Sequence, residues 1–140
     1  MDCFKTVKAI LSLCVILYAS ILDITTRIIP NRIYVFQLLT GLIYCDMGSL
    51  TGLILTAIPL CITAAVCKDF GGGDVKFGSL CGFILKGTNG LTALAIGSIL
   101  CFAVVPIIRK LSGDPAKWRR VPLIPFFSIG AACTICLHFL

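Results

Sequence analysis

The run VKAILSLCVILYASILDI at residues 7–24 decides the fold, because it is long and apolar enough to cross a lipid bilayer. A transmembrane helix needs about 20 predominantly apolar residues, with a range of about 17–25. We therefore predict an all-α, polytopic membrane helix bundle that forms a single domain over residues 1–140. Its five further segments are expected at 33–44, 50–67, 77–85, 91–108 and 121–140, the second and fourth of the six being short.

The composition of the whole chain indicates the same class of protein. Hydrophobic residues make up 59% and charged residues 13%, and the mean hydropathy is +1.07. Soluble domains average about 45–50% apolar and about 25% charged residues. Folding at this size buries only about 68–70% of the surface of the unfolded chain, too little to hide these side chains from water. A water-soluble enzyme, a disordered tail and a nucleic-acid reader are excluded, and the expected surroundings are membrane lipid.

The distribution of basic residues predicts an orientation in the membrane. The net charge is +6, and the connections 25–32, 68–76 and 109–120 together carry nine Lys and Arg residues. The opposite side of the predicted bundle carries three, including Lys5 and Lys8. By the positive-inside rule the side with nine faces the cytoplasm, and both chain ends lie on the other side. Lys5 and Lys8 argue against this orientation, because they flank the first segment.

Two of the acidic residues stand at the edges of apolar segments on the same side. All six acidic residues are Asp, and Asp23 and Asp74 hold these edge positions. Placing an ionisable group at the edge of the membrane costs free energy, so each of these residues is a candidate for a functional role. Two carboxylates in low dielectric cannot both ionise easily, so a pair shares one proton and can supply both a base and an acid. The alternatives are an ion pair of Asp23 with Arg27 and a capping role for Asp74 at a helix N-terminus.

The residues beside the two aspartates are of types that could shape an active site. Pro30 prevents the first helix from continuing, and Asn31 is suited to cap the next helix. The glycines at 71–73 remove side chains next to Asp74, which admits either a second helix or an extended peptide substrate. Lys76 either tunes Asp74 or anchors the segment at the interface.

The nine cysteines do not indicate a metal centre. Most lie inside apolar runs, where cysteine behaves as a small hydrophobic residue. Cys133 and Cys136 form a CxxC pattern, but a single pair without an accompanying His is a weak metal signal. We expect no metal and no cofactor.

Three stretches resemble the type IV prepilin peptidases, members of the GxGD class of intramembrane aspartic proteases. DITTRIIPNRI at 23–33 resembles their first motif, in which an Asp precedes an Arg and an Ile-Pro-Asn. GGGDVKFG at 71–78 resembles the Gly-x-Gly-Asp motif, and VPLIPFFSIGA at 121–131 is similar to the final helix. Order and spacing agree across nearly the whole chain.

This resemblance implies a peptidase that cleaves the short basic leader from type IV prepilins or pseudopilins at the cytoplasmic membrane face. Asp23 and Asp74 match the two catalytic aspartates. The substrate's own transmembrane helix is expected to supply the affinity, because the nearby basic side chains would repel a basic leader. The other matched positions, expected to shape the site, are Arg27, Pro30, Asn31, Gly71, Gly73 and Lys76. Small residues that could admit the substrate helix, or only pack within the bundle, are Gly78, Ser79 and Gly82.

The chain departs from the larger family members in one respect. Those members carry a cytoplasmic loop with two CxxC pairs and also methylate the new N-terminus, whereas only about eight residues separate the first two segments here. We therefore expect neither methyltransferase activity nor zinc. The short form is similar to prepilin peptidases of Flp-type pili and of Gram-positive or archaeal systems.

Two other classes of function fit the same aspartates. A small transporter or ion-conducting protein could use them as a proton or cation site. A non-catalytic component of a pilus or secretion machine would need neither carboxylate for chemistry.

Overall fold

The structure is a computed structural model in which residues 2–26, 28–66, 70–112 and 123–139 are described. These residues form six helices and no strands, so the predicted all-α architecture is confirmed. The helices are α1 (Asp2–Thr26), α2 (Asn31–Leu42), α3 (Met47–Val66), α4 (Gly72–Leu85), α5 (Gly87–Ser112) and α6 (Ile124–Phe139).

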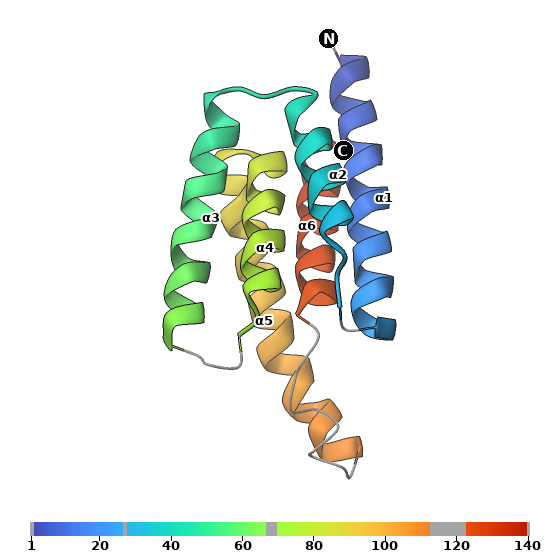
Figure 1. The fold of residues 1–140 in the computed structure, drawn as a ribbon, viewed down its shortest axis with the longest axis vertical. Coiled ribbons are helices and arrows are strands. Elements are labelled where there is room, and N and C mark those ends of the chain that lie inside the picture. Colours follow the sequence, from blue (N-terminus) through green and yellow to red (C-terminus); the bar gives the residue numbers. More distant parts are fainter. Residues whose placement is uncertain (1, 27, 67–69, 113–122, 140) are drawn as a thin grey trace.

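Successive helices run in opposite directions and bring alternate helix ends together (Figure 1). The ends of α1 and α3 lie at one end of the bundle with the beginnings of α2, α4 and α6, and α5 extends beyond them. Helix α4 contacts α2, α3, α5 and α6, which makes it the central helix. The other five helices surround it in the order α1, α2, α3, α5 and α6.

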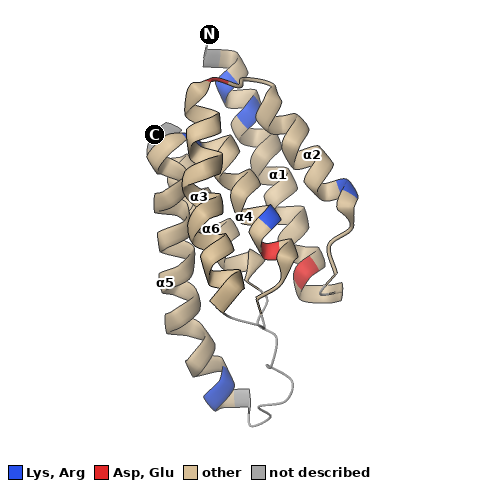
Figure 2. Cartoon of the chain, turned by 60° about the vertical axis from the view of Figure 1, so that its left-hand side comes forward, with Lys and Arg blue, Asp and Glu red and all other residues tan. Residues whose placement is uncertain are grey.

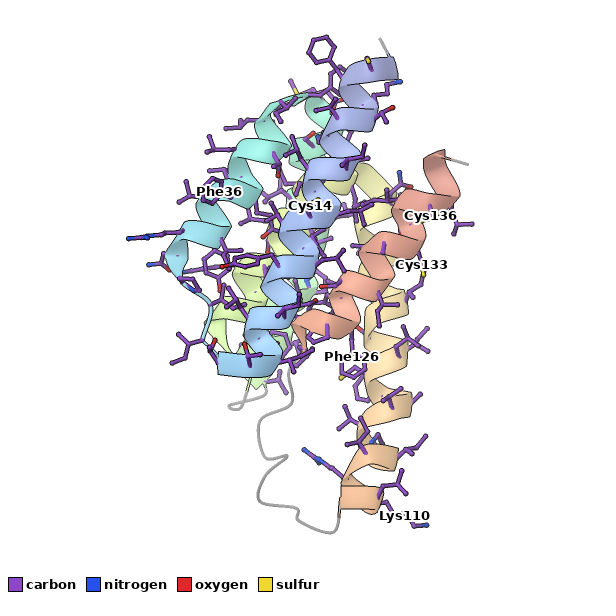
Figure 3. All side chains as sticks on the ribbon, turned by 90° about the vertical axis from the view of Figure 1, so that its right-hand side faces the viewer. Cys14, Phe36, Lys110, Phe126, Cys133 and Cys136 are labelled. Carbon is purple, nitrogen blue, oxygen red and sulfur yellow. The ribbon has the colours of Figure 1, made fainter. Side chains whose placement is uncertain are left out.

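Three helices, α1, α3 and α5, are long and apolar enough to cross a membrane, and α6 is a shorter apolar helix. The two segments predicted to be short are α2 and α4, with 12 and 14 residues. Large apolar side chains cover the outside of the bundle, as expected for a surface that meets lipid. Phe36 projects from α2, and the thiols of Cys133 and Cys136 are exposed on α6 (Figure 3).

Helix α1 begins five residues before the predicted segment and includes Lys8, which is only 6% exposed. The Lys8 Nζ atom donates to the backbone oxygens of Gly41 (3.2 Å) and Tyr44 (3.1 Å). These carbonyls lie at the C-terminal end of α2, where an ammonium group satisfies unpaired acceptors and complements the helix dipole. Lys8 therefore has a structural role that its position in the sequence did not indicate.

Glycines of α4 allow its backbone to touch α3. A Cβ atom at Gly82 would meet the side chain of Thr56 and lie 2.6 Å from the carbonyl oxygen of Gly52. One at Gly78 would lie 2.5 Å from Cδ1 of Leu60. Gly78, Ser79 and Gly82 are all buried, so the structure supports packing within the bundle as their role.

Replacement of Gly82 by alanine is expected to destabilise the bundle, because the short Thr56 side chain and the Gly52 carbonyl oxygen both face the new methyl group. Overpacking of this kind costs about 1–3 kcal/mol. Thermal unfolding of the detergent-solubilised protein, followed by circular dichroism, measures the effect.

The matched control is Gly72→Ala in the same helix, since nothing lies within 4 Å of a Cβ atom at Gly72. That variant should unfold at the wild-type temperature. Equal destabilisation of the two variants would contradict the importance of the α3–α4 contact.

Candidate active site

The end of α1 and the beginning of α4 place the two edge aspartates at the same end of the bundle. Asp23 lies in the last turn of α1 and is 8% exposed, and Asp74 lies in the first turn of α4 and is partly buried. Figure 2 shows the acidic positions of these two helices near each other. The two carboxyl groups are within range of each other's charge. The structure thus brings together two residues 51 positions apart in the sequence.

Asp74 also contributes to the start of its own helix. Its backbone N–H donates to the Gly71 carbonyl oxygen at 3.0 Å, and its carboxyl group lies beside Gly71, because a Cβ atom at Gly71 would be 3.2 Å from Oδ2 of Asp74. In a capping box, the side chain of the third helical residue reaches back toward the N-cap residue, and Asp74 has the corresponding position in α4. A capping role for Asp74 therefore stays a prediction that the position of its carboxyl group supports.

Tyr34 of α2 connects this helix to the glycine motif. Its hydroxyl donates to the carbonyl oxygen of Gly73 at 3.4 Å, one residue before Asp74. The same hydroxyl is within electrostatic range of both Asp23 and Asp74. Tyr34 could not be predicted from the sequence, because nothing local distinguishes it from the interfacial aromatic residues that membrane helices commonly carry.

The two motif glycines have different neighbours. A Cβ atom at Gly73 would lie 2.9 Å from the Tyr34 hydroxyl, and one at Gly71 would lie 3.2 Å from Oδ2 of Asp74. Neither glycine has a positive φ, since Gly87 is the only glycine with one in the described part of the chain. Lack of a side chain, and not backbone freedom, is therefore the property that the fold uses here.

The expectation that Asn31 caps α2 is wrong. Pro30 is the N-cap residue, with φ −66° and ψ 142°, and Asn31 is the first helical residue. An N-cap residue must be extended while its carbonyl accepts the first helical hydrogen bond, and Pro30 meets both requirements with the Ile33 N–H at 3.0 Å. Pro30, Asn31 and Lys76 are exposed at this end of the bundle, and Arg27 lies outside the described residues.

A pair of carboxyl groups in these surroundings suits acid–base chemistry on a peptide bond. Low dielectric disfavours two negative charges, so one proton shared by the pair leaves one ionised and one protonated group. The first can take a proton from water and the second can donate a hydrogen bond to a carbonyl. Among the described residues, no cluster of three or more His, Cys, Asp or Glu side chains could hold a metal ion.

The chain is similar to known leader peptidases. A family model described as the type IV leader peptidase family matches residues 10–107, which include both Asp23 and Asp74. The prepilin leader peptidase/N-methyltransferase of Bacillus subtilis (strain 168) is 28% identical over 134 residues, covering 88% of this chain and 52% of that protein. The chain thus spans about half the length of this curated relative. No solved structure matches significantly.

The capping role of Asp74 can be separated from its chemistry by two substitutions. Asp74→Asn keeps a side-chain oxygen that can accept the Gly71 N–H, so the unfolding temperature should stay close to wild type. Asp74→Leu removes the acceptor and should cost about 0.5–2 kcal/mol. Thermal unfolding in detergent distinguishes the two, and an equal loss of stability in both variants would contradict the capping geometry.

Proposed function

The chain belongs to the type IV leader peptidase family, and from that premise we propose that it is a membrane aspartic endopeptidase that removes leader peptides from type IV prepilins or prepilin-like proteins. The observation that carries the proposal is the approach of Asp23 and Asp74 at one end of the bundle, within range of each other's charge. Both residues lie inside the part of the chain that the family model matches.

In the proposed mechanism the pair starts with one proton. The ionised carboxylate takes a proton from water, and the water oxygen attacks the scissile carbonyl carbon. The protonated carboxyl group gives its proton to the carbonyl oxygen, which forms a geminal diol. When the C–N bond breaks, the leaving amine takes one proton and the diol returns one, so the pair regains its starting state.

The substrate is proposed to reach this site along the outer surface of the bundle. The small residues of α4 are occupied by α3, so they cannot admit a further helix. Exposed apolar side chains near Asp23 include Ile21 and Ile24 on α1. A prepilin's transmembrane helix can pack on such a surface and present its leader junction at the carboxyl groups, at the depth where a membrane-spanning segment meets water.

The site is proposed to face the cytoplasm. Nine of the basic residues belong to the connections that the sequence assigns to the carboxylate end, and the positive-inside rule predicts that the side richer in Lys and Arg faces the cytoplasm. Lys8 argued against this orientation on its sequence position. Its ammonium group is bonded to two carbonyl oxygens at the end of α2, which weakens that objection.

Asp23→Asn and Asp74→Asn should each lower prepilin cleavage roughly a thousandfold or more, because neither variant pair can supply both a base and an acid. The chain is co-expressed with a candidate prepilin, and the intact mass of the pilin reports whether the leader is removed. A non-catalytic assembly component or a transporter would not lose a cleavage activity in this way.

The matched control is Asp46→Asn, since Asp46 lies at the opposite end of the bundle and should leave cleavage unchanged. Retained cleavage in either active-site variant would remove the basis for a two-aspartate mechanism.

The same mass spectra test the proposed absence of methylation. Helix α1 ends at Thr26 and α2 begins at Asn31, so the connection between them holds no inserted domain. The mature pilin should therefore lack the mass of an added methyl group.

Tyr34→Phe should lower kcat about tenfold and leave KM nearly unchanged, because the proposed role of the hydroxyl is to position the Gly73 carbonyl beside Asp74 and not to bind the leader. Cleavage of a purified prepilin by the reconstituted protein measures both constants. Tyr18→Phe on the exposed face of α1 is the control and should behave as wild type. An unchanged kcat in Tyr34→Phe would show that this hydrogen bond does not position the site.

A further inference from the structure

The end of the bundle opposite the aspartates contains a basic cavity. Its volume is about 330 Å³, and its polar lining comes from Lys5, Lys8, Tyr44, Asp46, Lys86 and Asn89. These residues belong to the beginning of α1, the connection after α2 and the junction of α4 with α5. Figure 2 shows basic positions on α1 near the chain's N-terminus, away from the acidic positions of α1 and α4. The proposed peptidase mechanism uses none of them.

Only one of the three lysines has a carboxylate partner among the described residues. The Lys86 Nζ atom lies 2.6 Å from Oδ2 of Asp46 and 3.9 Å from the centre of the Tyr44 ring. The Lys86 hydrogen bond lowers the pKa of Asp46, so this carboxyl group stays ionised and offsets one lysine. Asp46 is the one acidic side chain in the cavity lining, and Lys5 and Lys8 form no ion pair among the described residues. Three lysines therefore face one carboxylate, which leaves the lining with a net positive charge.

The cavity also has unused hydrogen-bond donors. Lys8 is 6% exposed, and its ammonium group makes two hydrogen bonds to carbonyl oxygens, which leaves a third N–H. Within the described chain, the side-chain amide of Asn89 makes no hydrogen bond, and Asn89 lies in the first turn of α5, at the positive end of a 26-residue helix. An anion in the cavity would satisfy these donors together.

The backbone at Lys86 supports a specific role for its side chain. Lys86 adopts φ 66°, a conformation that favours glycine and is uncommon for other residues. A lysine held there places its ammonium group at the cavity in spite of the backbone strain.

The cavity lies at the membrane boundary. The candidate spans begin at Cys3, Met47 and Gly87, within a few residues of Lys5, Asp46 and Lys86. Apolar side chains, including Ile84 and Ile135, form another part of the lining. Positive charge beside an apolar wall at this depth matches an amphiphile with an anionic head, because the lysines attract the headgroup and the apolar wall can contact an acyl chain.

We propose that this cavity binds a phosphate group, carried into it by the headgroup of an anionic phospholipid or present as free phosphate. A volume of about 330 Å³ accommodates a phosphate-bearing headgroup, since small-molecule sites begin at about 300 Å³. Lys5 and Lys8 supply the charge, and Asn89 supplies a neutral donor.

Native mass spectrometry of the delipidated full chain in detergent tests the proposal. Phosphatidylglycerol is titrated alone and in the presence of inorganic phosphate, with phosphatidylcholine as the reference lipid. Wild type should retain phosphatidylglycerol in preference to phosphatidylcholine. Lys5→Glu should weaken phosphatidylglycerol binding about tenfold or more, because it places a negative charge in the cavity without removing any hydrogen bond of the fold.

The matched control is Lys110→Glu, which makes the same change of charge at the far end of α5 (Figure 3). It should bind phosphatidylglycerol as wild type does, and both variants should unfold at the wild-type temperature without lipid. Competition by inorganic phosphate would assign the site to free phosphate as well, and its absence would assign it to the lipid. Equal phosphatidylglycerol binding by wild type and Lys5→Glu, or no preference over phosphatidylcholine, would overturn the proposal.

Discussion

Helix α4 is short, and its place at the centre of the bundle depends on the absence of side chains at Gly78 and Gly82. With only 14 residues it must be covered by longer neighbours, and α3 comes close enough for Gly82 to contact Thr56 and the backbone of Gly52. Protein interiors are packed too tightly to absorb added methyl groups at such a contact without movement. This packing fixes the depth of α4 and therefore the depth of Asp74 in its first turn. The approach of Asp74 to Asp23 follows from it, because α1 ends at the same level (Figure 1).

The two ends of the bundle use charge in opposite ways. At one end, two carboxyl groups lie within range of each other, so their electrostatic interaction opposes full ionisation, as the proposed mechanism requires. At the other end, ammonium groups interact with helix C-terminal carbonyls, an aromatic ring and Asp46. Those interactions stabilise the fold and still leave excess positive charge at the cavity. A single bundle can hold both arrangements because alternate helix ends collect at opposite ends of the molecule.

The six segments could be predicted because apolar runs of this length have few stable arrangements in a bilayer. The pairing of Asp23 with Asp74 was anticipated from motif order, and the structure adds the helix directions that bring the two together. Contacts made by single side chains to distant backbone could not be predicted. Lys8 reaches carbonyls 33 and 36 residues away, and Tyr34 reaches one 39 residues away. Asn31 was wrongly predicted to be the N-cap of α2. Asn is a preferred N-cap residue, but Pro30, one position earlier, already has the extended geometry that an N-cap requires.

The neighbours of the three glycines before Asp74 give a physical reason for a Gly-x-Gly-Asp pattern. A side chain at the first position would press on the Asp74 carboxyl group, and one at the third would displace the Tyr34 hydroxyl. The middle position, Gly72, faces open space, since nothing lies within 4 Å of a Cβ atom there. The motif glycines thus serve the fold of the site itself, by keeping one carboxyl group and one hydroxyl in place. The space at Gly72 leaves this side of the first turn of α4 free, and an extended peptide could lie there beside the two carboxyl groups.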